Sequence, residues 1–379
     1  MKQLLVIAIA LASATAQANT ARLTALGNSA HLIDVQTVYT NPADIFSLGG
    51  DYVAFESGAT NAAGAQQGLG ATAKGMIVRT MGDAKLGLSL GNRSTTLRST
   101  AAALGTQVGA AGLNTAAGLQ IGQQNPLELT YGAKAGDMNW AGTLVYSNLN
   151  NKVTEAKEST TGVRFGARAG NWDASVRLGL ADTVQTLADG KYTGTMSLAV
   201  SGGYWMDSIY WFGNVRTAGY KTENAASVEQ AKGTLTQLSV GALTTMKKDG
   251  TEVFYSAQLA SNESKLDDSV GTTGGKISTL ALPLQIGVEA EANSWLTLRG
   301  SVSSNVQLIN NSKISPQSGA AATTDLAPGN DNINFAAGVG LKLNKVTVDA
   351  SLFTANGAGT NANITTDNML ANVGMSYWF

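Results

Sequence analysis

The last eleven residues, 369–379, read MLANVGMSYWF and carry the alternation that decides the fold. Every second position is apolar: Met369, Ala371, Val373, Met375, Tyr377 and Phe379. The positions between them include Asn372, Gly374, Ser376 and Trp378, with Leu370 as an exception. Because successive side chains of a strand point to opposite faces, this period of two predicts a strand with one apolar and one polar face.

The same alternation recurs from residue 51 onward in segments of roughly ten residues, the strand length of a membrane barrel. Seven short connections separate them, at 82–83, 137–139, 170–171, 206–208, 247–250, 293–294 and 344–345. Eight long ones lie at 59–72, 93–125, 151–159, 184–193, 221–233, 262–275, 308–331 and 355–367. Short and long connections alternate, which predicts sixteen antiparallel strands, with fourteen as the alternative count, and both chain ends beside the short turns.

The composition supports an all-β transmembrane barrel. Charged residues make up 13% of the chain, about half the share of an ordinary soluble domain. After residue 18 we find no apolar run of the length that a helical span needs. An antiparallel barrel in a bacterial outer membrane, with short periplasmic turns and long extracellular loops, fits both observations. The Ala/Gly-rich segment 93–125 is predicted to fold into the lumen, to pack on a neighbouring subunit, or to form an ordinary loop.

All six tryptophans lie close to a short turn or to the C-terminus. Aromatic side chains gather at the membrane–water interfaces of barrels, and the alternative is tryptophan beside the turns of a soluble β-sandwich. The predicted interface aromatics are Trp140, Trp172, Trp205, Trp211, Trp295, Trp378 and Phe379.

Three regions follow along the chain. Residues 1–18 are predicted to be a signal peptide, with Lys2 before an apolar run and a small-x-small cleavage site ending at Ala18. Residues 19–50 precede the first clear strand and are predicted to form a plug, partly helical, inside the lumen. Residues 51–379 form the predicted barrel.

Two family resemblances extend this prediction. The stretch AlaLeuGlyAsnSerAla at 25–30, followed by Asp34 and then by Asn41, Pro42 and Ala43, resembles the N-terminal plug of the long-chain fatty-acid transporter superfamily. That resemblance implies a hydrophobic ligand and a lateral opening, for which Pro283 is the candidate, although those transporters have fourteen strands. The chain also resembles the porin-like outer-membrane proteins of predatory Bdellovibrio-type bacteria, which implies oligomeric rings that hold lipid.

Charged residues of the predicted inward face carry the transport hypothesis, since opposed charges shape the field across a porin constriction. The constriction candidates are Arg164, Arg168, Arg177, Lys134, Glu128, Glu289, Arg299 and Lys342; Arg216 and Asp349 share the predicted inward face. Arg164, Arg168 and Arg177 are predicted either to form a basic cluster or to pair with acids such as Asp173.

The residue inventory argues against an enzyme. There is no cysteine, and His31 is the sole histidine, so a barrel hydrolase has one side chain to use as its base. We find no zinc or haem ligand set and predict no cofactor or metal. A net charge of -1 gives no sign of nucleic-acid binding.

The sequence therefore predicts a porin-like outer-membrane barrel for passive solute passage, lipid association, or both. The alternatives are a plugged transporter of fatty-acid or lipid ligands and a structural protein that organises membrane lipid. Expected partners are membrane lipid, the outer-membrane assembly machinery and further copies of the chain, as a trimer or pentamer. The solute, its charge, and whether the lumen is open stay undetermined at this stage.

Overall fold

The computed structural model describes residues 20–58, 73–93, 123, 125–153, 155–186, 190–267, 274–315, 322–325, 333–357 and 372–379. The predicted signal peptide and nearly all of segment 93–125 lie outside these residues. The N-terminal segment, residues 20–50, contains a short helix α2 (Thr20–Ala25) and two 3₁₀ turns, η2 (Thr37–Tyr39) and η3 (Pro42–Phe46). Within the described residues no helix has the length and apolarity to cross a bilayer.

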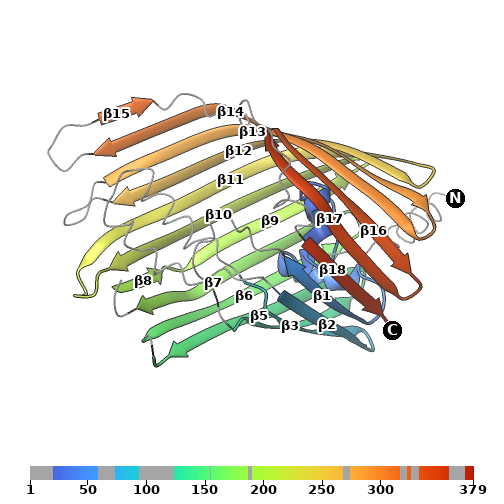
Figure 1. Cartoon of the computed structure of the whole chain (residues 1–379), viewed down its shortest axis with the longest axis horizontal. Helices are drawn as coiled ribbons and strands as arrows, with labels where there is room; N and C mark the ends of the chain where they lie inside the picture. Colours follow the sequence, from blue (N-terminus) through green and yellow to red (C-terminus); the bar gives the residue numbers. More distant parts are fainter. Residues whose placement is uncertain are drawn as a thin grey trace.

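Eighteen strands follow in a single antiparallel sheet (Figure 1). The first nine are β1 (Tyr52–Gly58), β2 (Ala73–Met81), β3 (Ala84–Leu90), β4 (Leu127–Ala135), β5 (Met138–Asn151), β6 (Ala156–Ala169), β7 (Trp172–Thr186), β8 (Gly190–Gly194) and β9 (Ser197–Met206). The others are β10 (Ile209–Glu223), β11 (Glu229–Lys248), β12 (Thr251–Asp267), β13 (Gly274–Asn293), β14 (Leu296–Ser315), β15 (Ala322–Asp325), β16 (Ile333–Leu343), β17 (Val346–Gly357) and β18 (Asn372–Trp378).

The sheet closes on itself. β1 pairs with β2 on one side and with β18 on the other, with Tyr52 opposite Trp378. β8 and β9 both pair with β7 and β10, so together they form one interrupted strand. β15 and β16 both pair with β14 and form a second interrupted strand. Counted this way the barrel has sixteen strands, as predicted. Closure matters in a membrane because an open sheet would leave two edges of unpaired backbone groups.

The short turns fall where the sequence places them, within one or two residues, and gather at one end of the barrel (Figure 1). Their local chemistry explains this, because tight hairpins need residues that tolerate a positive φ. Such residues occur in six of the seven turns: Gly82, Gly136, Gly170, Asp207, Asp249 and Asn344.

Five of the eight long connections are shorter than predicted. β12 runs to Asp267 and β14 to Ser315, although 262–275 and 308–331 were expected to be loops, and β7 and β8 leave only 187–189 of the expected loop 184–193. Connections 151–159 and 221–233 shrink to 152–155 and 224–228 in the same way. These strand ends, such as AsnGluSerLys at 262–265, are polar on both faces. The apolar alternation therefore stops before the backbone ladder does.

Pro283 interrupts the sheet as its missing N–H requires. It stays opposite Asn305 of β14, whereas the pairing of β13 with β12 is broken between Leu284 and Ala281. The break is local, because pairing resumes on both sides of it.

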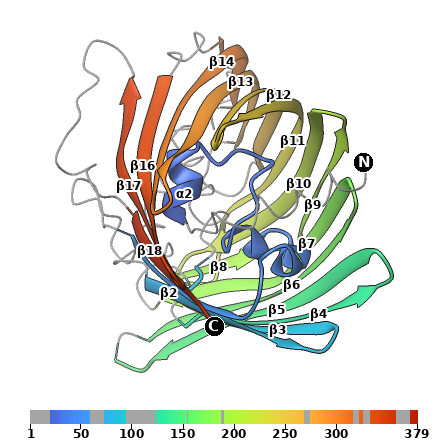
Figure 2. The same ribbon diagram turned by 90° about the vertical axis from the view of Figure 1, so that its right-hand side faces the viewer.

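The N-terminal segment lies inside the barrel. Figure 2 shows α2 and the 3₁₀ turns within the ring of strands. Two apolar clusters pack this segment on the wall: Leu26 and Leu32 meet Leu243 and Phe254, and Ile45 and Leu48 belong to a cluster with Val78. The segment thus fills part of the lumen near the short turns.

Candidate functional site in the barrel lumen

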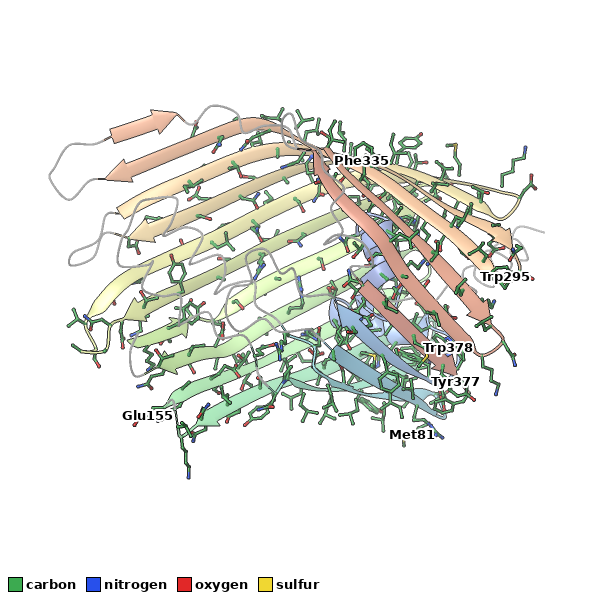
Figure 3. The ribbon with its side chains drawn as sticks, in the orientation of Figure 1. Met81, Glu155, Trp295, Phe335, Tyr377 and Trp378 are labelled. Carbon is green, nitrogen blue, oxygen red and sulfur yellow. The ribbon has the colours of Figure 1, made fainter. Side chains whose placement is uncertain are left out.

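The outer face of the barrel is apolar. Val215 of β10 lies opposite Val200 of β9 on one side and opposite Leu238 of β11 on the other, and all three side chains are exposed. Labelled side chains such as Phe335 and Trp295 stand on the outside of the ribbon (Figure 3). A closed, even-numbered antiparallel barrel with short turns at one end and such an outer face has the architecture of bacterial outer-membrane proteins. The chain is an outer-membrane β-barrel of this class.

Most predicted interface aromatics lie on the outer face at the short-turn end. Trp140, Trp211, Trp295 and Phe379 are each more than a third exposed. Trp172 is half-buried, and its register partner Tyr204 is exposed on the outer face.

Two of the predicted interface aromatics, Trp205 and Trp378, face the lumen instead. Trp205 packs beside Leu26 and Tyr210, and Trp378 packs on Tyr52 with their ring centroids 4.7 Å apart. Proximity to a turn does not decide which way a strand residue points; the alternation does, and it places their neighbours Tyr204 and Tyr377 outside. Figure 3 labels Tyr377 and Trp378 at this end.

A buried charge network joins α2 to the wall. Arg22 donates to Glu289 through Nε at 3.1 Å and through Nη2 at 2.8 Å, and Arg299 donates to the same carboxylate at 2.8 Å. Arg299 also contacts Asp349 of β17. All four side chains are buried, so each charge requires the partners it has. Of the sequence-predicted constriction residues, Glu289 therefore binds the N-terminal segment directly, and Arg299 is joined to it through Glu289.

Asp34 adds a fifth ionisable group to this network. It is fully buried, 3.6 Å from Arg22, and one of its oxygens has no hydrogen-bond partner. Burial, partly offset by Arg22, raises the pKa of Asp34 to about 8. The folded protein therefore holds a proton on Asp34 at neutral pH.

A second set of polar contacts holds the AsnProAla motif. Asn41 accepts a hydrogen bond from the Ala43 amide and begins η3, with Pro42 at its first position. Arg168 donates twice to Asp44, at 3.0 and 2.8 Å, and lies 3.7 Å from Asp173. Burial raises the pKa of Asp44, and the Arg168 guanidinium acts against this. Arg168 therefore pairs with acids, one of the two outcomes that the sequence left open.

Lys85 fixes the exit of the segment. Its ammonium donates to the carbonyls of Ile45 and Leu48 at 3.0 and 2.9 Å, and to that of Gly50 at 3.3 Å. These carbonyls come from the end of η3 and the chain after it, where backbone acceptors lack helical partners. The segment is thus held at its start, its middle and its end.

Arg164 and Glu128 form a bidentate pair on the wall beyond the segment. The two nitrogen–oxygen distances are 2.5 and 2.9 Å, and Asn92 donates to the same carboxylate at 2.8 Å. The pair satisfies the Arg164 charge within the protein.

Arg177 and Arg216 differ from these paired arginines. Both are half-buried and line a cavity of about 160 Å³, together with Arg164, Thr160, Ser197 and Ala199. Among the described residues, the structure records no hydrogen bond or ion pair for either guanidinium. Gln123, a buried residue of segment 93–125, also lines this cavity; the rest of the prediction for that segment falls almost entirely outside the described residues.

The remaining candidates, Lys134 and Lys342, lie apart from these groups. Both are exposed, close to the short turns at 136–137 and 344–345. No ion pair is recorded for either lysine with the part of the chain that the structure describes. The structure therefore brings six of the eight predicted charged residues into three groups in the lumen and leaves the two lysines near the short turns. The groups are Glu289 with Arg299, Arg168 with Asp44, and Glu128 with Arg164 and Arg177.

His31 sits between the segment and the wall. Its Nδ1 lies 3.0 Å from the Ser29 hydroxyl and its Nε2 lies 3.3 Å from Glu252, while its ring packs on Trp205 and Phe254. The two ring nitrogens thus contact a hydroxyl and a carboxylate, but in the reverse of the order in a serine-hydrolase triad, where Nε2 faces the serine and Nδ1 the carboxylate. Ser29 is also only 5% exposed, so its hydroxyl is covered by protein. Over the described ranges, His, Asp and Glu form no group of three that would hold a metal ion.

Sequence reasoning did not name Arg22 or Asp44 as site residues, and it noted Asp34 only within the resemblance to the fatty-acid transporter plug. Each lies in the N-terminal segment, where no strand parity assigns a side chain to a face. The signal in the sequence that could have identified them is a charged residue within a short segment that is otherwise largely apolar.

No protein-family model matches the sequence, and no curated protein matches it. Among solved structures the chain is similar to a porin refined at 1.8 Å, with 11% identity, coverage of 87% of this chain and 99% of that chain, and a TM-score of 0.39. It is similar to the CymD monoaromatic hydrocarbon channel, with 9% identity, coverage of 95% and 97%, and a TM-score of 0.41. It is also similar to OmpT, an outer membrane protein of Vibrio cholerae, with 10% identity, coverage of 87% and 96%, and a TM-score of 0.38. Nothing in these comparisons supports the finer resemblance to the fatty-acid transporters or to the predatory-bacterium proteins.

Proposed function

We propose that the chain is a porin-like barrel that lets small polar solutes cross the outer membrane through a lumen narrowed by residues 20–50. The observation that carries this proposal is the cavity at Arg177 and Arg216, on the wall beyond the N-terminal segment, where charged, hydroxyl and apolar side chains meet. Cations on a lumen wall that have no recorded partner among the described residues favour hydrated, polar solutes over hydrocarbon.

The contrary proposal, a hydrophobic ligand in the lumen, has less support. The apolar part of the lumen is taken up by the protein itself, because Leu26, Leu32, Ile45 and Leu48 fill the contacts with the wall. A fatty acid would need to displace that packing. Lipid association outside the barrel, and assembly into trimers or pentamers, stay predictions that native mass spectrometry from gentle detergent would test.

An enzymatic role has less support than passage. The His31 ring packs on Trp205 and Phe254, and Ser29 is only 5% exposed, so a substrate carbonyl has no open approach to the Ser29 hydroxyl. We expect the parent protein and the His31→Gln variant to hydrolyse a test ester at the same rate, equal to the background rate without protein.

Solute flux into liposomes tests the proposed function. Purified, folded protein reconstituted into liposomes should admit small neutral sugars and exclude large ones, seen as swelling measured by light scattering. Liposomes with heat-denatured protein are the control. Swelling no faster than this control, with folded protein in the bilayer, would contradict the proposal.

A further inference from the structure

We propose that Arg177 and Arg216 form a binding site for a single phosphate or carboxylate group. The strand register places them at one level of the wall. Arg164 of β6 lies opposite Arg177 of β7, and Ala199 of β9 lies opposite both Arg177 and Arg216 of β10. One row across the four neighbouring strands β6, β7, β9 and β10 therefore holds three arginines, and Ala199 stands between the second and the third.

The alanine leaves room between two of these arginines. Neighbouring strands are about 4.8 Å apart, so the backbones of Arg177 and Arg216 are separated by roughly 10 Å. Ala199 carries only a methyl group in the space between them and is itself buried. An anion over Ala199 is within reach of two guanidinium groups, whose planar donors match phosphate and carboxylate oxygens.

The charge balance at this level also calls for an anion. Arg164 is neutralised by Glu128, whereas the described residues supply no recorded partner for Arg177 or Arg216. Asp182 lines the same cavity, but it stands five positions further along β7, where it accepts from the Thr160 hydroxyl at 3.2 Å. Two like charges at this spacing repel each other, and a bound anion removes that repulsion.

The cavity has the right size for a small group. A volume of about 160 Å³ leaves room for one phosphate or carboxylate with water around it. Thr160 and Ser197 supply further hydroxyl groups on the lining.

Calorimetric titration of the folded protein in neutral detergent with inorganic phosphate tests the site. We expect saturable binding that weakens about tenfold in Arg177→Gln and in Arg216→Gln, since each loses charge-assisted hydrogen bonds. Saturable binding should disappear in the double variant. Arg177→Lys, which keeps the charge without the planar fork, should bind with intermediate affinity.

Lys345→Gln is the matched control, because it removes the same charge from an exposed short turn and should leave phosphate binding unchanged. Circular dichroism confirms the strand content of each variant. Parent protein without saturable binding, or a double variant that binds as the parent does, would overturn the proposal.

Two further arms identify the source of the anion. Unchanged phosphate affinity in vesicles of zwitterionic lipid and in vesicles containing phosphatidylglycerol assigns the site to solutes, whereas competitive loss in the anionic vesicles assigns it to a lipid headgroup. The proposed anion site depends on the proposed function in one respect only, because the anion must reach the site through the lumen. Sugar flux without phosphate binding contradicts the site alone, and phosphate binding without flux contradicts the passage proposal alone.

Discussion

At Arg22, one side chain of the N-terminal segment meets a carboxylate 267 residues away in sequence. Glu289 receives both Arg22 and Arg299, and Arg299 in turn contacts Asp349. Buried ion pairs of this kind add little net stability over apolar packing, but removing one member leaves the other charges uncompensated. The network therefore specifies where the segment lies more than it strengthens the barrel.

Neutralising Glu289 should have a large effect. Glu289→Gln leaves two buried guanidinium groups facing an amide, and we expect a loss of about 3–5 kcal/mol in the free energy of unfolding, measured by urea titration in detergent. Glu263→Gln is the control, since that carboxylate pairs with Lys276 on the surface and should cost less than about 1 kcal/mol. Equal losses in the two variants would speak against a buried network.

Asp34 predicts a pH dependence. Its folded pKa of about 8 lies above the usual aspartate value, so the folded state binds the proton more tightly than the unfolded state does. This contribution to stability is complete at low pH and is lost as the pH rises toward 8. The urea midpoint of the parent protein should thus fall between about pH 4 and pH 8, the interval between the ordinary and the folded pKa of this carboxyl, and by clearly less in Asp34→Asn. The same fall in both proteins would refute this assignment.

At the scale of elements, the AsnProAla turn η3 depends on a glycine in the wall. Gly166 of β6 faces this turn, and a Cβ at that position would meet Asn41, Pro42 and the Ala43 amide. Sequence reasoning found the AsnProAla motif, but no pattern in the sequence relates a plug to the strand that it touches.

Gly166→Ala should push η3 from the wall and cost about 1–3 kcal/mol in unfolding free energy, measured by the same urea titration. Gly300→Ala is the matched control, because a Cβ there meets one backbone oxygen at an ordinary 3.7 Å and should leave the stability nearly unchanged. A Gly166 variant as stable as the control would mean that the segment does not pack on β6.

Strand identity and short turns follow from local chemistry, and the sequence predicts them well. A turn residue that accepts a positive φ and the two-residue alternation of a strand are both determined by a few neighbouring residues. Side-chain pairing over long distances is different. Arg168 was predicted either to join a basic cluster or to pair with an acid, and Asp44, 124 positions earlier, decided the outcome. Trp205 was misplaced because one position along a strand reverses its face.

At the scale of the whole molecule, the barrel keeps apolar residues outside and charges inside. Val215 lies seven residues from the turn at 207–208 and is exposed on the outer face. Val215→Arg should cost about 2–4 kcal/mol when the protein unfolds from lipid vesicles, as expected for a charge near the bilayer midplane. Val153→Arg should be near neutral, because Val153 is 94% exposed in a long connection. Equal tolerance of the two substitutions would argue against the membrane belt.

The central claim, a barrel that passes polar solutes around its N-terminal segment, is tested most directly by single-channel conductance in planar bilayers. Folded parent protein should insert and give discrete conductance steps in potassium chloride. The variant Asp44→Asn with Arg168→Gln, which frees η3, should give larger or more variable steps. Inserted, folded protein that stays silent in both forms would contradict the account.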